Sequence, residues 1–285
     1  MRTLPDKRDI RLPGRAGIQI QGSQNPGGGT VKNKKPKFAF FDFTDCEGCQ
    51  LQIVNLNTVL VELLEHIEIV NFREATSERR NDYDVAVVEG SVSTPHDIER
   101  LVKIRRQAKT IVALGACATI GGVNAVKNLN PPGIAQHRVY GDKGKNFETL
   151  PVKPIDCFIK VDYYIQGCPV HLNEVAEVFK CILAGKKYDM PNYPVCMECK
   201  MNENVCLYQK GQDCLGPVTR AGCGSWCINN NNICYSCRGL VDNPAVDAQR
   251  DILDKYGLKL DEMLAKFSLY SACGGEKYDQ EIKKR

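Results

Sequence analysis

Residues 37–50 read KFAFFDFTDCEGCQ and join a hydrophobic run directly to a pair of cysteines. The run 37–43 is rich in aromatic residues, which favour strands, so it predicts a buried β-strand. Cys46 and Cys49 follow it in a CxxC pattern, with Gly48 between them. Ligands of open parallel sheets bind beyond the carboxyl ends of the strands, so this stretch predicts a site at a sheet edge.

The chain beyond residue 50 alternates between strand-like and helix-like patterns. Thr94 and Pro95 have the residue types of an N-cap and a first helical residue. We expect helices over 50–66, 94–107 and 171–183, and strands over 67–71, 85–88, 110–114 and 157–164. This alternation is typical of an α/β protein with a doubly wound parallel sheet of the flavodoxin-like type.

Three regions differ in composition. Residues 1–36 contain Pro, Lys and a GGG run with little periodic pattern, and we interpret them as an arm or linker. Residues 37–189 form the expected flavodoxin-like domain. Residues 190–285 form a small irregular domain that holds eight cysteines between Cys196 and Cys237 and ends in a helical tail over 245–266. Metal binding can supply the folding energy of such a segment.

The overall composition excludes several classes of function. The 285 residues include 15 cysteines but only four histidines, and the formal net charge of +4 is too small to indicate a nucleic-acid partner. No run of 18 apolar residues predicts a membrane span. The N-terminal residues lack the apolar core of an export signal, so we expect the reducing cytoplasm, where clustered cysteines are metal ligands rather than disulfides.

Four cysteines of the first domain follow predicted strands. Cys46 and Cys49 follow the first strand, Cys117 lies in GACA after the run TIVAL, and Cys168 lies in GCP near the last strand. The carboxyl ends of parallel strands share one edge, so these four thiols can converge on one site.

The second domain contains two further sets of four cysteines. Their spacing is CxxCx6Cx7C from Cys196 and Cx3Cx6CxxC from Cys223. Four thiolates suit either a [4Fe–4S] cluster or a zinc ion, and the spacing leaves both open. A zinc-binding structural or scaffold protein on a flavodoxin-like domain is therefore the alternative to an iron–sulfur protein.

Several motifs taken together point to one family. They are DCEGC, GACA, QGCP, CLGPVTRAGCGSWC and CYSCRG. With them the sequence resembles the small, electron-transfer subunits of cytoplasmic [NiFe] hydrogenases, of the sulfhydrogenase delta or F420-non-reducing hydrogenase type. The resemblance implies an oxidoreductase complex acting on H2, with no catalytic residue in this chain and the NiFe centre in a separate large subunit.

The resemblance also implies three [4Fe–4S] clusters. Cys196 stands where related exported proteins have a histidine, and Cys227 where some have a proline, so we expect cysteine ligation throughout. The implied ligands are Cys46, Cys49, Cys117 and Cys168 for a proximal cluster, Cys223, Cys227, Cys234 and Cys237 for a medial cluster, and Cys196, Cys199, Cys206 and Cys214 for a distal cluster.

Electron partners follow from the same resemblance. A flavoprotein, a ferredoxin-like protein or a heterodisulfide-reductase-like protein could exchange electrons with the distal cluster. The sequence does not select among them, and it does not set the direction of electron flow.

Overall fold

The structure is a computed structural model that describes residues 34–273. The arm predicted over 1–36 lies outside the described residues apart from residues 34–36. None of the helices between residues 34 and 273 combines the length and hydropathy that crossing a bilayer requires.

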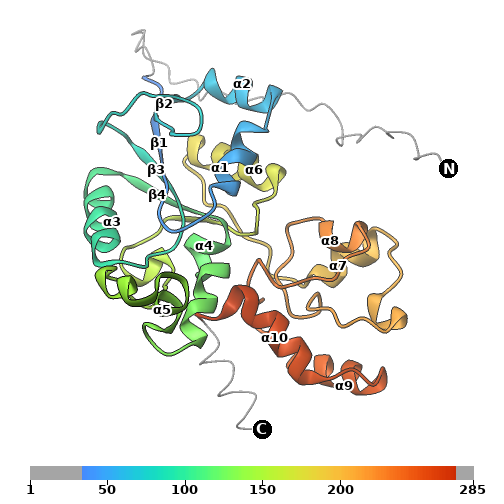
Figure 1. The fold of residues 1–285 in the computed structure, drawn as a ribbon. Coiled ribbons are helices and arrows are strands. Elements are labelled where there is room, and N and C mark those ends of the chain that lie inside the picture. Colours follow the sequence, from blue (N-terminus) through green and yellow to red (C-terminus); the bar gives the residue numbers. More distant parts are fainter. Residues whose placement is uncertain (1–33, 274–285) are drawn as a thin grey trace, which may run out of the picture. The chain divides into compact units, whose positions relative to one another are not determined.

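A five-stranded parallel sheet organises the first part of the chain. Its strands lie in the order β2-β1-β3-β4-β5 (Figure 1). This is the strand order of flavodoxin-like folds, so the predicted fold class is confirmed. The strands are β1 (Lys37–Phe41), β2 (Glu68–Asn71), β3 (Val85–Glu89), β4 (Thr110–Leu114) and β5 (Tyr163–Ile165).

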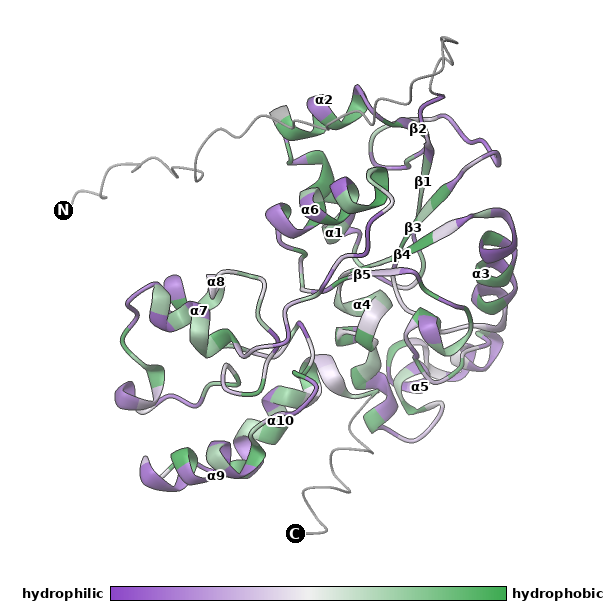
Figure 2. Ribbon diagram, turned by 180° about the vertical axis from the view of Figure 1, so that it is seen from behind, coloured by the Kyte–Doolittle hydropathy of each residue, from purple (hydrophilic) through white to green (hydrophobic). Residues whose placement is uncertain are grey.

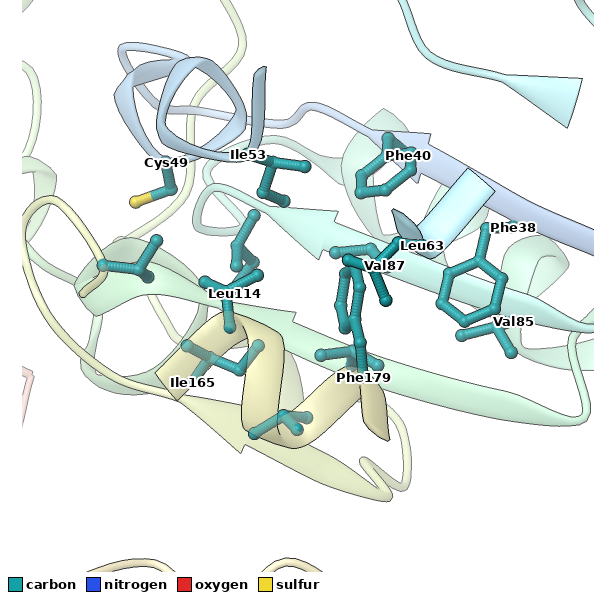
Figure 3. Close-up of a cluster of buried hydrophobic side chains, with 14 of the residues drawn as sticks. Phe38, Phe40, Cys49, Ile53, Leu63, Val85, Val87, Leu114, Ile165 and Phe179 are labelled. Carbon is teal, nitrogen blue, oxygen red and sulfur yellow. The ribbon is translucent and has the colours of Figure 1, made fainter. Parts of the chain in front are cut away.

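Alternate residues of each strand face opposite sides of the sheet, and each side has its own core. Phe38 and Phe40 of β1 belong to one core, together with α1 (Gly48–Val54), α2 (Thr58–Leu64) and α6 (Leu172–Leu183). Cys49 lies at the end of this core (Figure 3). The thiol of Cys49 is thereby held by the same packing that stabilises the sheet.

The opposite core includes Ala39 of β1 and the helix α3 (Pro95–Gln107). Leu101 and Ile104 of α3 are buried, while hydrophilic residues also line the helix (Figure 2). Thr94 caps the helix: its side chain accepts from the backbone N–H of Asp97, whose side chain accepts from the N–H of Thr94. The predicted start of this helix is confirmed, and such a cap contributes about 1 kcal/mol.

Two predicted elements are wrong in their bounds. The helix expected over 50–66 is two helices, because Asn57 adopts a positive φ of 51° that an α-helix cannot accommodate. The strand expected over 157–164 is only β5, because Pro154 precedes a short 3-10 helix, η3 (Ile155–Cys157), instead.

The chain after residue 190 contains short helices joined by loops. The expected single tail helix is interrupted at Gly257, whose φ is +64°. The elements are α7 (Val195–Met201), η4 (Leu207–Lys210), α8 (Trp226–Asn229), α9 (Val246–Lys255) and α10 (Leu260–Ser271).

Four elements between β4 and η3 were not predicted from the sequence. They are α4 (Gly115–Ile120), η1 (Val123–Leu129), α5 (Ile134–Tyr140) and η2 (Gly141–Asn146). Of these, α4 carries Cys117 and packs against the ends of the strands (Figure 1).

Candidate metal centres

The first four cysteines lie at the carboxyl edge of the sheet, as the sequence predicts. Cys46 lies in the loop after β1 and Cys49 in α1; Cys117 lies in α4, directly after β4, and Cys168 follows β5. Their loops touch: the backbone N–H of Ala116 donates to the carbonyl of Gly167 at 2.7 Å. The segments that carry Cys117 and Cys168 are thus joined beside the end of β4.

A glycine leaves room for one of these thiols. Gly115 has a φ of +82°, and a Cβ atom built on it would lie 2.5 Å from Sγ of Cys49. Only glycine allows the end of β4 to approach the thiol that follows β1 this closely. The close approach brings two ligand-bearing segments together across the neighbouring strand β3.

The environment of these thiols keeps them protonated as long as no metal is bound. Burial raises the pKa of Cys117 to about 12, and the nearby thiols of Cys168 and Cys46 add to that rise. Burial also raises the pKa of Cys49 and of Cys168. A thiol of this kind loses its proton when a metal binds, because the cation then supplies the compensating charge.

Glu89 holds the first site in place and was not predicted from the sequence. It ends β3, is only 2 % exposed, and its carboxylate accepts the backbone N–H groups of Cys49 at 2.9 Å and Gln50 at 2.8 Å. Burial raises the pKa of Glu89 to about 7. An acidic residue at the end of a buried strand run, as in VAVVEG, was the available signal.

The cysteines from Cys196 to Cys214 form a second group. Cys196 and Cys199 lie on α7, while Cys214 lies in the loop after η4. A Cβ atom on Gly216 would lie 3.3 Å from Sγ of Cys196 and 3.5 Å from Sγ of Cys214. Burial raises the pKa of Cys196 to about 12, and the thiols of Cys214, Cys199 and Cys206 contribute.

The cysteines from Cys223 to Cys237 lie beside both other groups. The pKa of the Cys237 thiol is raised to about 12, mainly by burial. The backbone of Cys168 opposes this rise, whereas the thiols of Cys223 and Cys227 add to it. The backbone N–H of Cys234 donates to Sγ of Cys214 at 3.4 Å. Cys234 therefore contacts a cysteine of the second group, and its assignment to the third group stays a prediction.

The donors present suit iron–sulfur clusters. A nearby backbone N–H lowers the pKa of a cysteine in each group, for example Val170 for Cys49, Gly216 for Cys214 and Ser225 for Cys223. Such bonds stabilise thiolate ligands and tune cluster potentials. Among residues 34–273, no three or more His, Cys, Asp and Glu side chains lie close enough together to hold a metal ion as they stand.

Three cysteines lie outside these groups. Cys157 is exposed and lies in η3, so it is not part of the strand expected over 157–164. Cys181 is half-buried on α6. Cys273 is half-buried, and its thiol donates to the carbonyl of Val152 at 2.9 Å.

Comparison with known proteins identifies relatives of this chain. Residues 46–182 match the model of the NADH ubiquinone oxidoreductase 20 kDa subunit family. The chain is 42% identical over 205 residues to the sulfhydrogenase 2 subunit delta of Pyrococcus furiosus, covering 71% of this chain and 86% of that protein. This chain belongs to the family of hydrogenase small subunits. It is therefore a subunit of an oxidoreductase that acts on H2.

Other members of the hydrogenase small-subunit family match over a similar extent. Identity to the iron-sulfur subunit of the F420-non-reducing hydrogenase of Archaeoglobus profundus is 31% over 267 residues, covering 72% of this chain and 82% of that protein. Among solved structures, a chain of an NAD+-reducing [NiFe]-hydrogenase superposes with a TM-score of 0.50 at 26% identity. That match covers 55% of this chain and 96% of the other.

Proposed function

We propose that this small subunit relays electrons between the NiFe centre of a large subunit and a redox partner through three [4Fe–4S] clusters. The observation that carries the proposal is the contact between successive cysteine groups. The backbone of Cys168 lies close enough to the thiol of Cys237 to lower its pKa, and the backbone N–H of Cys234 donates to the thiol of Cys214 at 3.4 Å. Each contact joins one proposed ligand set to the next, which supports a row of three sites.

These contacts also support the proposed order of the row. Cys46, Cys49, Cys117 and Cys168 would hold the proximal cluster, the Cys223 set the medial cluster and the Cys196 set the distal cluster. When bound, each cluster supplies one-electron redox chemistry at a potential set by its ligands, hydrogen bonds and exposure. The chain would supply the ligands, keeps every one of these thiols except that of Cys46 buried or half-buried, and donates a backbone N–H to the sulfur of Cys214.

The large subunit is the proposed partner at the sheet edge. Cys46 is exposed there, and Leu51 and Val54 on the neighbouring helix α1 are 47% and 36% exposed. Exposed apolar residues beside a buried site fit a permanent protein interface better than open solvent. The acceptor at the other end of the row is a flavoprotein, a ferredoxin-like protein or a heterodisulfide-reductase-like protein.

The remaining expectations belong to the same proposal. The complex functions in the cytoplasm, and residues 190–285 act as the domain that extends the row outward from the flavodoxin-like domain. Exposed Met201, Val205 and Trp226 lie in that region, near cysteines of the distal and medial sets. They are the proposed contact surface for the electron partner.

Exposure to H2 tests the proposed function. We expect the visible absorbance of the anaerobically purified complex with its large subunit to bleach under H2 and to return when an artificial acceptor is added. The reason is that electrons from H2 reduce the clusters of this chain. Bleaching should be absent when the large subunit is omitted. A colourless complex, or a coloured one that H2 never bleaches, would contradict the proposal.

A further inference from the structure

The loop that carries Cys223 is held on one side by Glu198. This carboxylate lies on α7, between Cys196 and Cys199, and accepts the backbone N–H of Gly222 at 2.8 Å and of Ser225 at 3.1 Å. Its Oε2 atom lies 3.9 Å from Sγ of Cys223. Glu198, on the helix that carries Cys196 and Cys199, therefore places a negative charge against the loop that carries Cys223.

The same loop is held on the other side by Arg238, which directly follows Cys237. Gly222 has a φ of +116°, and a Cβ atom on it would overlap the guanidinium group of Arg238. Arg238 is 1% exposed and donates to the carbonyl of Ala221 at 2.8 Å. Gly222 is therefore enclosed between a carboxylate and a guanidinium group.

Arg238 also contacts the first domain. Its guanidinium group donates to the carbonyl of Gln166 at 2.6 Å and binds both carboxylate oxygens of Glu174 at 2.5 and 2.8 Å. Gln166 lies two residues before Cys168, and Ala221 lies two residues before Cys223. One buried side chain thus connects the ligand loops of the proximal and medial sets.

The two charges of the bidentate ion pair between Arg238 and Glu174 lie at different distances from the medial ligands. The carboxylate of Glu174 comes from α6, in the first domain, whereas the guanidinium group lies against Gly222 and beside Cys223 and Cys237. The positive end of the ion pair is therefore the end nearer the medial ligands. Fork geometry of this kind fixes position as well as charge.

We propose that Arg238 and Glu198 are positioning residues that clamp the Cys223 loop and set the reduction potential of its cluster in opposite directions. The inference rests on the proposed function, because it requires a cluster on the Cys223 set. Reduction adds one electron and hence one negative charge to the cluster. Arg238 favours that charge and raises the potential, whereas Glu198 opposes it and lowers the potential.

The first test replaces Glu198 with glutamine in the assembled complex. Glu198→Gln keeps the shape of the side chain and one acceptor oxygen but removes the charge. We expect the medial cluster to become easier to reduce in an EPR-monitored redox titration. Its reduced-to-oxidised ratio at fixed potential should rise about tenfold, which is 59 mV for a one-electron couple.

A matched control has the same chemical change outside the clamp. Glu203 lies two residues beyond the end of α7 and is exposed, so Glu203→Gln should leave the titration unchanged. If the Glu198→Gln complex instead lacks about four iron atoms that the Glu203→Gln complex retains, the clamp itself is supported. A fully loaded Glu198→Gln complex with an unchanged titration would overturn the proposal.

The second test removes the other charge without leaving Glu174 buried and unpaired. The double replacement Arg238→Gln with Glu174→Gln should shift the same cluster in the opposite direction, toward a lower potential. Arg238→Lys keeps the charge and should retain the potential even where the lost fork weakens cluster binding. Shifts of the same sign in the Glu198 and Arg238 variants would overturn the proposal. Failure of the proposed function would look different, since the unmodified complex would then give no iron–sulfur signal at all.

Discussion

Replacing Cys199 with alanine is expected to abolish electron delivery to the natural acceptor while leaving H/D exchange at the NiFe centre intact. Cys199 lies on α7 in the Cys196 set. Because the Cys237 thiol lies close to Cys168, the Cys223 set is the proposed medial set, and the Cys196 set would hold the exit cluster of the proposed row. Acceptor reduction should fall to the background rate, since the last cluster in the row is lost. H/D exchange needs no electron to leave the complex.

The comparison requires variants that still assemble, because loss of a cluster can unfold the segment that it cross-links. Cys181→Ala is the matched control, as Cys181 lies on α6 outside the three groups. It should keep both activities. Full acceptor reduction by an assembled Cys199→Ala complex would contradict the proposed order of the clusters.

A single methyl group at Gly115 is expected to remove the proximal cluster. The Cβ atom of Gly115→Ala would lie 2.5 Å from Sγ of Cys49, so the thiol or the end of β4 must move. We expect about four fewer iron atoms per chain, together with loss of H2-dependent reduction of the remaining clusters. Iron analysis and the visible spectrum under H2 measure the two effects.

Gly133 provides a control with the same backbone strain. Its φ is +84°, against +82° at Gly115, but nothing lies within 4 Å of a Cβ atom placed on it. Both substitutions cost about 1–2 kcal/mol of backbone strain, so only Gly115→Ala should lose iron. Equal iron contents in the two variants would show that the contact with Cys49 does not shape the site.

The sequence predicted the sheet and the edge at which the first cysteines lie, because both depend on local patterns. The runs 37–43, 85–88 and 110–114 are apolar over the length of a strand, and each lies where a strand forms. Cys46 and Cys49 follow β1 within a few residues, and Cys117 follows β4, so the ends of these strands determine where the thiols lie. Cys46, Cys49 and Cys117 therefore lie where the sequence predicted.

Features that depend on contacts between distant segments were not predictable in the same way. Arg238 is buried against Glu174, which lies 64 positions earlier in the chain. The hydrogen bonds from α1 to Glu89 and from the Cys223 loop to Glu198 likewise join distant segments. The break between α1 and α2 was not predicted, because apolar residues recur at helical spacing on both sides of Asn57.

Metal analysis of the anaerobically purified chain tests the central claim most directly. Three clusters with cysteine ligands require about twelve iron atoms and about twelve acid-labile sulfides per chain, with no stoichiometric zinc. That result would support an electron relay along the whole row of sites. About four iron atoms with about two zinc ions would contradict it, because the Cys196 and Cys223 sets would then be structural zinc sites that carry no electrons.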